Sequence, residues 1–200
     1  FADRPKVLAT VHIADLKHRP KLDLVTRKDF VKIRSVLDGT WPKPMPPRID
    51  ANTCSYEVMV AWFNEAAKAP YIVIDTEYDP DTKTLGLIGL SIPGDYPTPV
   101  IQYHWFEGST QSGRRTDFLY WLRETVRDVP SVFQNALADI PVLRQACNID
   151  WPDYKRVEDT MQAHAVLWCE LPHSFEFMAS VDGQYPKVKH LYGIDTDLYN

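Results

Sequence analysis

The chain has 200 residues, 44% of them hydrophobic, and a formal net charge of −5. This length fits one globular domain of roughly 150 residues with an additional segment, because single cores usually stop growing near that size. The longest apolar runs are interrupted well before the roughly 20 residues that a membrane-crossing helix needs. The negative charge argues against broad electrostatic wrapping of nucleic acid, but it allows a site of clustered carboxylates that recruits metal ions.

The three cysteines, Cys54, Cys147 and Cys169, are widely spaced and form no CxxC pair. This pattern excludes a cysteine-based structural zinc site and favours a reducing compartment, so we expect a cytoplasmic protein. The chain begins at Phe1 and has no basic stretch followed by an apolar leader. We therefore expect an interior piece of a longer protein.

A proline-rich stretch divides the chain. Before it, a short strand is predicted over Lys6–Val11 and, after a loop, a helix over Arg27–Leu37, where apolar residues recur at helical spacing. The stretch Trp41–Pro47 carries four prolines and cannot continue a helix or a central strand. The predicted division is an N-terminal segment over residues 1–40, a linker over 41–51 and a main domain over 52–200.

The main domain is predicted to open with a helix over Tyr56–Ala67, with Ser55 as its N-cap and Pro70 beyond its end. Three apolar runs separated by Asp, Pro and Gly then suit an antiparallel meander: Tyr71–Glu77, Thr84–Ile92 and Thr98–Phe106. Next come a helix over Asp117–Asp128, a strand over Ser131–Gln134, a helix over Ile140–Cys147, a strand over Arg156–Asp159 and a helix over Thr160–Glu170. This order predicts an α/β fold with a mixed five-stranded sheet flanked by helices.

Asp75 and Glu77 end the first apolar run of the main domain. In a strand, side chains at i and i+2 point to the same face, so two like charges would lie side by side. Such a pair costs free energy unless a cation neutralises it, and a divalent metal ion is the simplest such cation. The alternative is that both carboxylates begin a solvated turn that continues into Asp79-Pro80-Asp81.

Two further aspartates follow short strands. Asp139 comes after the strand Ser131–Gln134 and Asn135, at the expected entry to a helix, and Asp159 ends the strand Arg156–Asp159. Aspartate is common at helix N-caps, so capping is an alternative to metal binding at Asp139. At Asp159 we favour capping.

Taken in chain order, the short segments around these acidic residues resemble the motifs of the DEDD 3′→5′ exonucleases, which have a ribonuclease H-like fold. The similarity is greatest to the proofreading exonuclease domain of family A (polymerase I-like) DNA polymerases, and it covers about residues 52–200. The matching strings are Asp75-Thr76-Glu77, then Gln134-Asn135 with Asp139, then Asp159-Thr160-Met161 with His173-Ser174-Phe175, and finally Leu198-Tyr199-Asn200. The last resembles the opening of a motif whose aspartate would come three residues beyond Asn200.

The resemblance implies two divalent metal ions, Mg²⁺ or Mn²⁺, held by Asp75, Glu77 and Asp139. It also implies that these three residues and Tyr199 are catalytic, with Tyr199 orienting the attacking water. The residues expected near the terminal nucleotide are Thr76 and Tyr78, through their backbone, and Asn135.

The implied activity is removal of nucleotides from the 3′ end of single-stranded DNA, with a DNA polymerase domain linked downstream. We expect this chain to bind metal weakly and to cleave slowly or not at all, because one of four metal ligands is not included. An RNA-trimming exonuclease of the ribonuclease D type shares these motifs and remains an alternative. A structural domain that keeps the fold without chemistry is a third hypothesis, although the intact acidic cluster speaks against it.

The N-terminal segment, residues 1–40, resembles the C-terminal end of a uracil-DNA glycosylase. The similarity rests on a strand that leads into Thr10-Val11-His12 and on a closing helix that contains Asp29 and Phe30. Ile13 stands where that family has proline, which is a departure from its pattern. A glycosylase tail joined to a proofreading exonuclease would suit a large replication polyprotein, for example a viral polymerase, and the alternative is an unrelated packing arm.

Overall fold

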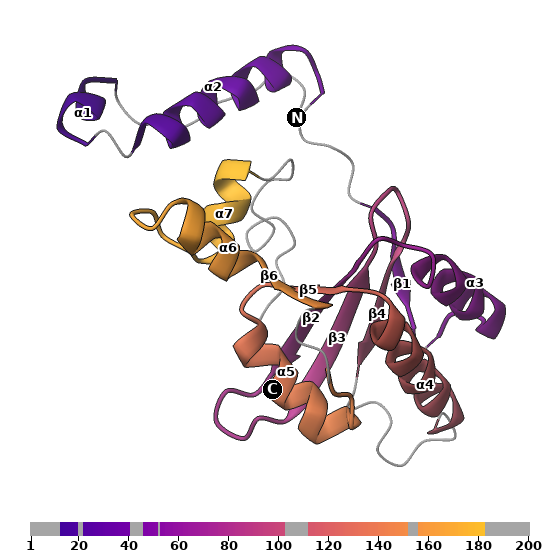
Figure 1. The fold of residues 1–200 in the computed structure, drawn as a ribbon. Coiled ribbons are helices and arrows are strands. Elements are labelled where there is room, and N and C mark those ends of the chain that lie inside the picture. The colour runs from indigo at the N-terminus through magenta and orange to yellow at the C-terminus, as the bar shows by residue number, and fades with distance from the viewer. Residues whose placement is uncertain are drawn as a thin grey trace. The chain divides into compact units, whose positions relative to one another are not determined.

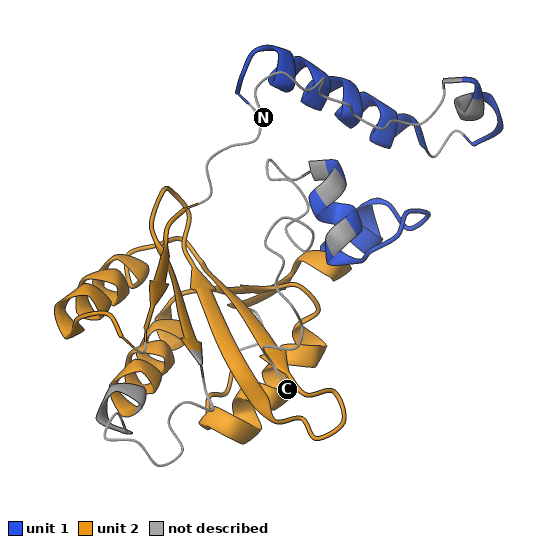
Figure 2. Cartoon of the chain, turned by 180° about the vertical axis from the view of Figure 1, so that it is seen from behind, with its two compact units in different colours: residues 1–45, 163–198, 200 blue, residues 46–162, 199 orange. Residues whose placement is uncertain are grey.

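The computed structural model describes residues 13–19, 22–40, 46–51, 53–102, 112–151 and 156–182. The predicted strand Lys6–Val11, the glycosylase-like His12 and the expected catalytic Tyr199 lie outside these residues. Figure 1 shows the helices and strands of the chain, which separates into two compact units (Figure 2). We call residues 46–162 the sheet unit, and we call the described residues of 1–45 and 163–198 the helical unit.

The described strands of the sheet unit form one six-stranded sheet in the order β1-β4-β3-β2-β5-β6. The strands are β1 (Arg48–Asp50), β2 (Ile72–Tyr78), β3 (Leu85–Ser91), β4 (Thr98–Gln102), β5 (Ser131–Phe133) and β6 (Val157–Asp159). The helices are α3 (Tyr56–Ala66), α4 (Ser112–Asp128), α5 (Ala136–Cys147) and the first residues of α6 (Thr160–Leu167).

The mixed character of the sheet is confirmed. Strands β2, β3 and β4 form the expected antiparallel meander, while β2, β5 and β6 pair in parallel. The sixth strand, β1, was not predicted: it pairs in parallel with β4 and lies inside the stretch 41–51 expected to be a linker. A three-residue edge strand next to prolines carries too little alternation for sequence patterns to indicate it.

The core lies between the sheet and its helices. On β2, Ile72 and Ile74 are buried, and α5 packs against β2, β3, β5 and β6. The pair α3 and α4 lies on the other side of the sheet (Figure 1). Trp62 of α3 is buried and donates its indole N–H to the carbonyl of Pro97 at 2.8 Å. This packing fixes β2 in the middle of the sheet, where its carboxyl end carries the acidic pair.

Two helices of the sheet unit begin earlier than the sequence predicts. The N-cap of α3 is confirmed, because the Ser55 hydroxyl accepts from the backbone N–H of Val58 at 3.3 Å. However, α4 begins at Ser112 instead of Asp117, and α5 begins at Ala136 instead of Ile140. Asp139 therefore lies in the first turn of α5 and does not cap it.

The helical unit contains α1 (Ile13–His18), α2 (Asp23–Leu37), the end of α6 and α7 (Phe175–Asp182). The predicted helix Arg27–Leu37 is present and starts four residues earlier, whereas α1 occupies a stretch expected to be a loop and α7 was not predicted. Helix α2 packs against α7. Buried His164 and half-buried His173 approach each other, with their Nδ1 atoms 2.8 Å apart.

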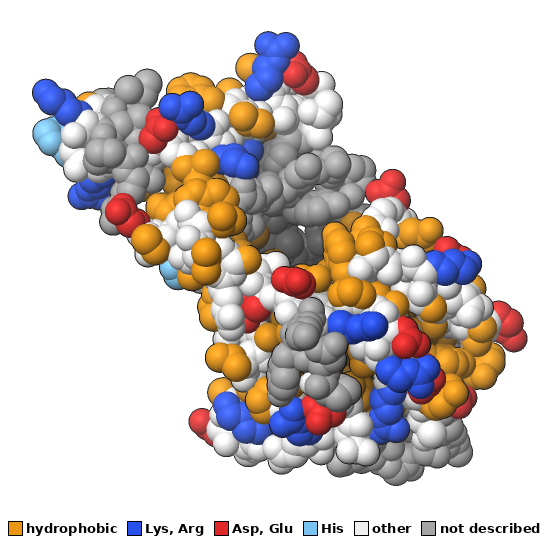
Figure 3. Space-filling view, viewed as in Figure 1, with side chains coloured by type: hydrophobic (Ala, Val, Ile, Leu, Met, Phe, Trp, Pro, Cys, Tyr) orange, Lys and Arg blue, Asp and Glu red, His pale blue; other side chains and the backbone are white. Residues whose placement is uncertain are grey.

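On the face shown in Figure 3, basic and acidic side chains lie interspersed among the described residues of the sheet unit. Within the described ranges, no helix combines the length and hydrophobicity needed to cross a membrane.

Candidate active site

The acidic pair lies within a strand and not in a turn. Strand β2 continues through Tyr78, and along it the side chains of Asp75 and Glu77 are exposed while that of Thr76 between them is buried. The two carboxylates therefore share one face, as the i and i+2 spacing predicts. The turn begins only at Asp79, whose carboxylate accepts from the backbone N–H groups of Asp81 and Thr82. The solvated-turn alternative is thus wrong for Asp75 and Glu77.

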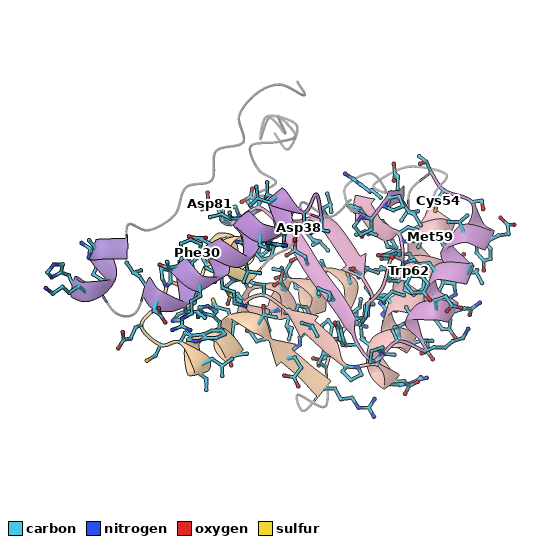
Figure 4. All side chains as sticks on the ribbon, turned by 90° about the horizontal axis from the view of Figure 1, so that it is seen from above. Phe30, Asp38, Cys54, Met59, Trp62 and Asp81 are labelled. Carbon is cyan, nitrogen blue, oxygen red and sulfur yellow. The ribbon has the colours of Figure 1, made fainter. Side chains whose placement is uncertain are left out.

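A bulge lies next to the acidic pair. Glu77 pairs with Leu87 and Tyr78 pairs with Leu85, so Gly86 on β3 is left without a partner in the register. Bulges bend a strand and change the direction of neighbouring side chains, and they often occur beside active sites. Asp81 of the hairpin turn appears in Figure 4 well away from Met59 and Trp62 of α3. The bulge therefore lies between the acidic pair and the hairpin turn, and that turn lies apart from α3.

Asp139 is joined to β2 by two hydrogen bonds. Its Oδ1 accepts from the backbone N–H of Thr76 at 3.2 Å and from the Thr76 hydroxyl at 2.5 Å. Asp139 itself is only 4% exposed. The capping alternative for Asp139 is therefore wrong, because its carboxylate accepts from a strand 63 residues earlier and not from the end of its own helix.

Asp159 is the capping residue at this end of the sheet, as predicted. Its carboxylate accepts from the backbone N–H groups of Met161 and Gln162 at the start of α6, and from those of Asn135 and Ala136 at the start of α5. One side chain therefore satisfies free N–H groups of two helices. Asn135 has a left-handed backbone, with φ 72° and ψ 58°, and makes no side-chain cap for α5. The cap of α5 thus comes from a residue 23 positions beyond its first residue, Ala136.

Six of the seven predicted site residues line one pocket of about 350 Å³. They are Asp75, Thr76, Glu77, Tyr78, Asn135 and Asp139, joined by Pro80, Gln134 and Ala138. The volume lies in the range of roughly 300–1,000 Å³ that is typical of pockets for small ligands. Three carboxylate side chains from β2 and α5 thus line one space that could hold one nucleotide.

Sequence reasoning missed Pro80 and Ala138 as lining residues and Lys83 as a neighbour of the pocket. The Lys83 ammonium lies 5.1 Å from the centre of the Tyr78 ring, a cation–π contact that holds a pocket-lining aromatic group. Lys83 also has a left-handed backbone, with φ 58°. The only sequence signal for this contact is Asp79-Pro80, which indicates a turn between Tyr78 and Lys83.

The carboxylates perturb one another. Burial raises the pKa of Asp75 to about 6, and the charges of Asp139 and Glu77 add to the increase. The Asp75 side chain still reaches solvent through the open pocket, so the surrounding protein desolvates it only in part. Burial also raises the pKa of Asp139, while the two Thr76 hydrogen bonds oppose that increase. Charging the pocket at neutral pH is therefore costly without a compensating cation.

The donor set suits hard divalent cations, since Mg²⁺ and Ca²⁺ prefer carboxylate oxygens. None of the ion pairs formed by the described residues involves Asp75, Glu77 or Asp139. Within the described ranges, however, no three acidic, histidine or cysteine side chains stand close enough together to enclose an ion as they are. The pocket thus offers carboxylate donors of the kind that divalent cations prefer, without a preformed three-ligand site among the described residues.

No known family description matches the chain, and no curated protein matches its sequence. Solved structures do match its fold. The catalytic core of RRP6 from Trypanosoma brucei is 17% identical, with 77% of this chain aligned to 42% of that one and a TM-score of 0.50. RNase D from Trypanosoma brucei in complex with RNA U12 is 14% identical, with 71% aligned to 49% and a TM-score of 0.52. A structure described as the apo form of a nuclease is 20% identical, with 73% aligned to 65% and a TM-score of 0.50.

These matches establish a common fold, which agrees with the ribonuclease H-like class expected from the sequence. The chain spans less than two thirds of each of the three structures.

Proposed function

We propose that the sheet unit is a metal-dependent 3′→5′ exonuclease that removes nucleotides from single-stranded nucleic acid. The observation that carries this proposal is the convergence of Asp75, Glu77 and Asp139 in one nucleotide-sized pocket. Burial raises the pKa of Asp75, and the charges of Asp139 and Glu77 add to the increase. A carboxyl group perturbed by burial and by specific charged neighbours in a pocket is typical of a functional site. The shared fold with nuclease structures supports the same activity.

In this proposal each residue has a task that its position allows. Asp75 and Glu77 present their carboxylates from one face of β2, and Asp139 adds a third from the first turn of α5. Two divalent ions, Mg²⁺ or Mn²⁺, would activate a bound water as the nucleophile at neutral pH and would stabilise the negative charge on the leaving oxygen. Tyr78 and Asn135 line the same pocket and would contact the terminal nucleotide.

We further propose single-stranded DNA as the substrate and a downstream DNA polymerase as the covalently linked partner, in a protein that works in the cytoplasm. The motif strings of the chain support this choice over the alternatives. RNA trimming is the second candidate, and the fold shared with an RNase D bound to RNA favours it.

The test uses single-stranded DNA and RNA of one sequence, labelled at the 5′ end and incubated with excess protein and Mn²⁺. We expect slow, stepwise shortening of the DNA from its 3′ end with release of mononucleotides, and we expect Asp75→Asn to abolish it. Faster shortening of the RNA would select the second candidate. Oligonucleotides that stay intact and gain no Mn²⁺-dependent affinity for the protein would contradict the exonuclease proposal.

A further inference from the structure

Thr76 lies in sequence between two proposed metal ligands, but its side chain points to the opposite, buried face of β2. It is only 8% exposed. Its backbone N–H and its hydroxyl both donate to Asp139. A threonine hydroxyl has one proton to donate, so the Thr76 side chain is not available as a donor to substrate. Its role must be sought in what it does to Asp139.

The Thr76 N–H is available to Asp139 because a neighbouring strand ends early. Strand β5 pairs with β2 only at Ile72 and Val73, and the N–H of Ile72 donates to the carbonyl of Pro130. Alternate N–H groups of a strand point to the same side, so the N–H of Thr76 faces the same edge of β2. There the chain has already turned into α5, and the Asp139 carboxylate supplies the acceptor that β5 no longer provides.

Both hydrogen bonds end on the same carboxylate oxygen. A carboxylate oxygen accepts two hydrogen bonds through its two lone pairs, so Oδ1 of Asp139 is fully used by Thr76. No other residue in the described part of the chain donates to Oδ1, and none donates to Oδ2. Thr76 therefore binds Oδ1 of Asp139, and Oδ2 remains free to interact with a ligand in the pocket that Asp139 lines.

We propose that the Thr76 hydroxyl is a positioning group that makes Asp139 a one-oxygen ligand, presenting only Oδ2 to a divalent cation. The inference rests on the proposed function, because it takes Asp139 as a metal ligand. One-oxygen binding suits Mg²⁺, which demands octahedral geometry and keeps several waters. Two-oxygen binding by a freely rotating carboxylate suits Ca²⁺, which accepts bidentate carboxylates and more ligands. Thr76 thus biases the site toward the smaller ion.

The test measures the affinities of the 200-residue chain for Mg²⁺ and Ca²⁺ by their competition against Mn²⁺, followed by electron paramagnetic resonance. Thr76→Val keeps the shape and the backbone N–H but removes the hydroxyl. We expect it to lower the ratio of Mg²⁺ to Ca²⁺ affinity by about tenfold, since loss of a group that orients a metal ligand typically costs 10–100-fold in affinity. Thr76→Ser, which keeps the hydroxyl, should retain the wild-type ratio.

Thr125→Val is the matched control. Thr125 is 5% exposed, its hydroxyl donates to the carbonyl of Trp121 at 2.8 Å, and it does not line the pocket. Thr125→Val also removes a buried threonine hydroxyl, so it reproduces any general effect of that loss on stability. Its ratio of Mg²⁺ to Ca²⁺ affinity should equal that of the wild type. Metal-free melting curves establish that the variants fold, and if Thr76→Val does not, Thr76→Ala is compared with Thr76→Ser in its place.

The outcomes separate the two proposals. A wild-type chain that binds none of the three ions would overturn the exonuclease proposal and this inference with it. A wild-type chain that binds Mn²⁺, with the same ion ratio in the valine and serine variants, would overturn only the role of Thr76. A ratio that falls equally in Thr76→Val and Thr125→Val would show a general packing effect and would also overturn it.

Discussion

Two strand-to-helix junctions look alike in sequence and serve different purposes in the structure. At the β6–α6 junction Asp159 is the last residue of the strand, and its carboxylate faces the free N–H groups of two helices. At the β5–α5 junction Asp139 lies one turn inside the helix, where those groups are out of reach, and its carboxylate bonds to β2 instead. A shift of one helical turn therefore decides whether an aspartate holds the fold together or faces the pocket.

The sharpest way to test this contrast is to remove the charge at the pocket. We expect Asp139→Asn to lower the rate of 3′-end cleavage by about 1,000-fold, because a lost metal ligand removes several kcal/mol of transition-state stabilisation. The amide can still accept from Thr76, so the metal-free melting temperature should stay close to that of the wild type. Single-turnover cleavage of a 5′-labelled oligonucleotide and a melting curve measure the two effects.

Asp159→Asn is the matched control for that experiment. It makes the same change at the other junction and keeps an oxygen to cap the helices, so it should reduce cleavage far less. Equal losses of activity in both variants would mean that the two junctions do not divide their tasks as we infer.

The second prediction addresses the structural junction. Asp159→Ala removes the acceptor for four backbone N–H groups at the starts of α5 and α6. We expect the free energy of unfolding to fall by about 2–3 kcal/mol, because one helix cap contributes roughly 0.5–2 kcal/mol and this side chain serves two helices. Urea unfolding followed by circular dichroism measures the loss, and a change below about 0.5 kcal/mol would show that water replaces the carboxylate without cost.

A third prediction concerns the electrostatic cost on the pocket side. The pKa of Asp75 is raised from 3.8 to about 6 in the folded protein. The protonated carboxyl is therefore favoured by folding, and this contribution is fully present below pH 3.8 and is lost as the pH rises through 6. Asp75→Asn keeps the neutral form at all pH values. It should therefore raise metal-free stability at pH 8 by about 1 kcal/mol, after allowance for solvent screening in the open pocket, with little effect near pH 4.

Thermal unfolding in a metal chelator at the two pH values measures this difference. The same reasoning predicts that Mn²⁺ stabilises the wild-type chain more at pH 8 than at pH 5, since protons compete with the ion for Asp75. If the stabilisation by Mn²⁺ does not depend on pH, Asp75 is not a ligand of the bound ion.

The sequence predicts those parts of the molecule whose causes are local. The apolar run before Asp75 predicts β2, and Ser55 predicts the start of α3, because alternation and capping act within a few residues. The convergence of Asp75, Glu77 and Asp139 was also expected, from the order of the motif strings and not from local physics. The start of α5 was missed because its cap comes from Asp159, and contacts between distant residues leave no local pattern.

The smallest expected effect concerns the backbone that sets the start of α5. Asn135 has a left-handed backbone at φ 72°, a conformation that asparagine and glycine tolerate and that costs other residues roughly 1–2 kcal/mol. Asn135→Gly should change the free energy of unfolding by no more than a few tenths of a kcal/mol, whereas Asn135→Ala should lower it by about 1 kcal/mol. Because the glycine variant keeps the backbone and removes a pocket-lining side chain, it isolates the contact of Asn135 with substrate. We expect the KM for the oligonucleotide to rise in Asn135→Gly while metal affinity is retained, and an unchanged KM would leave Asn135 with a backbone role alone.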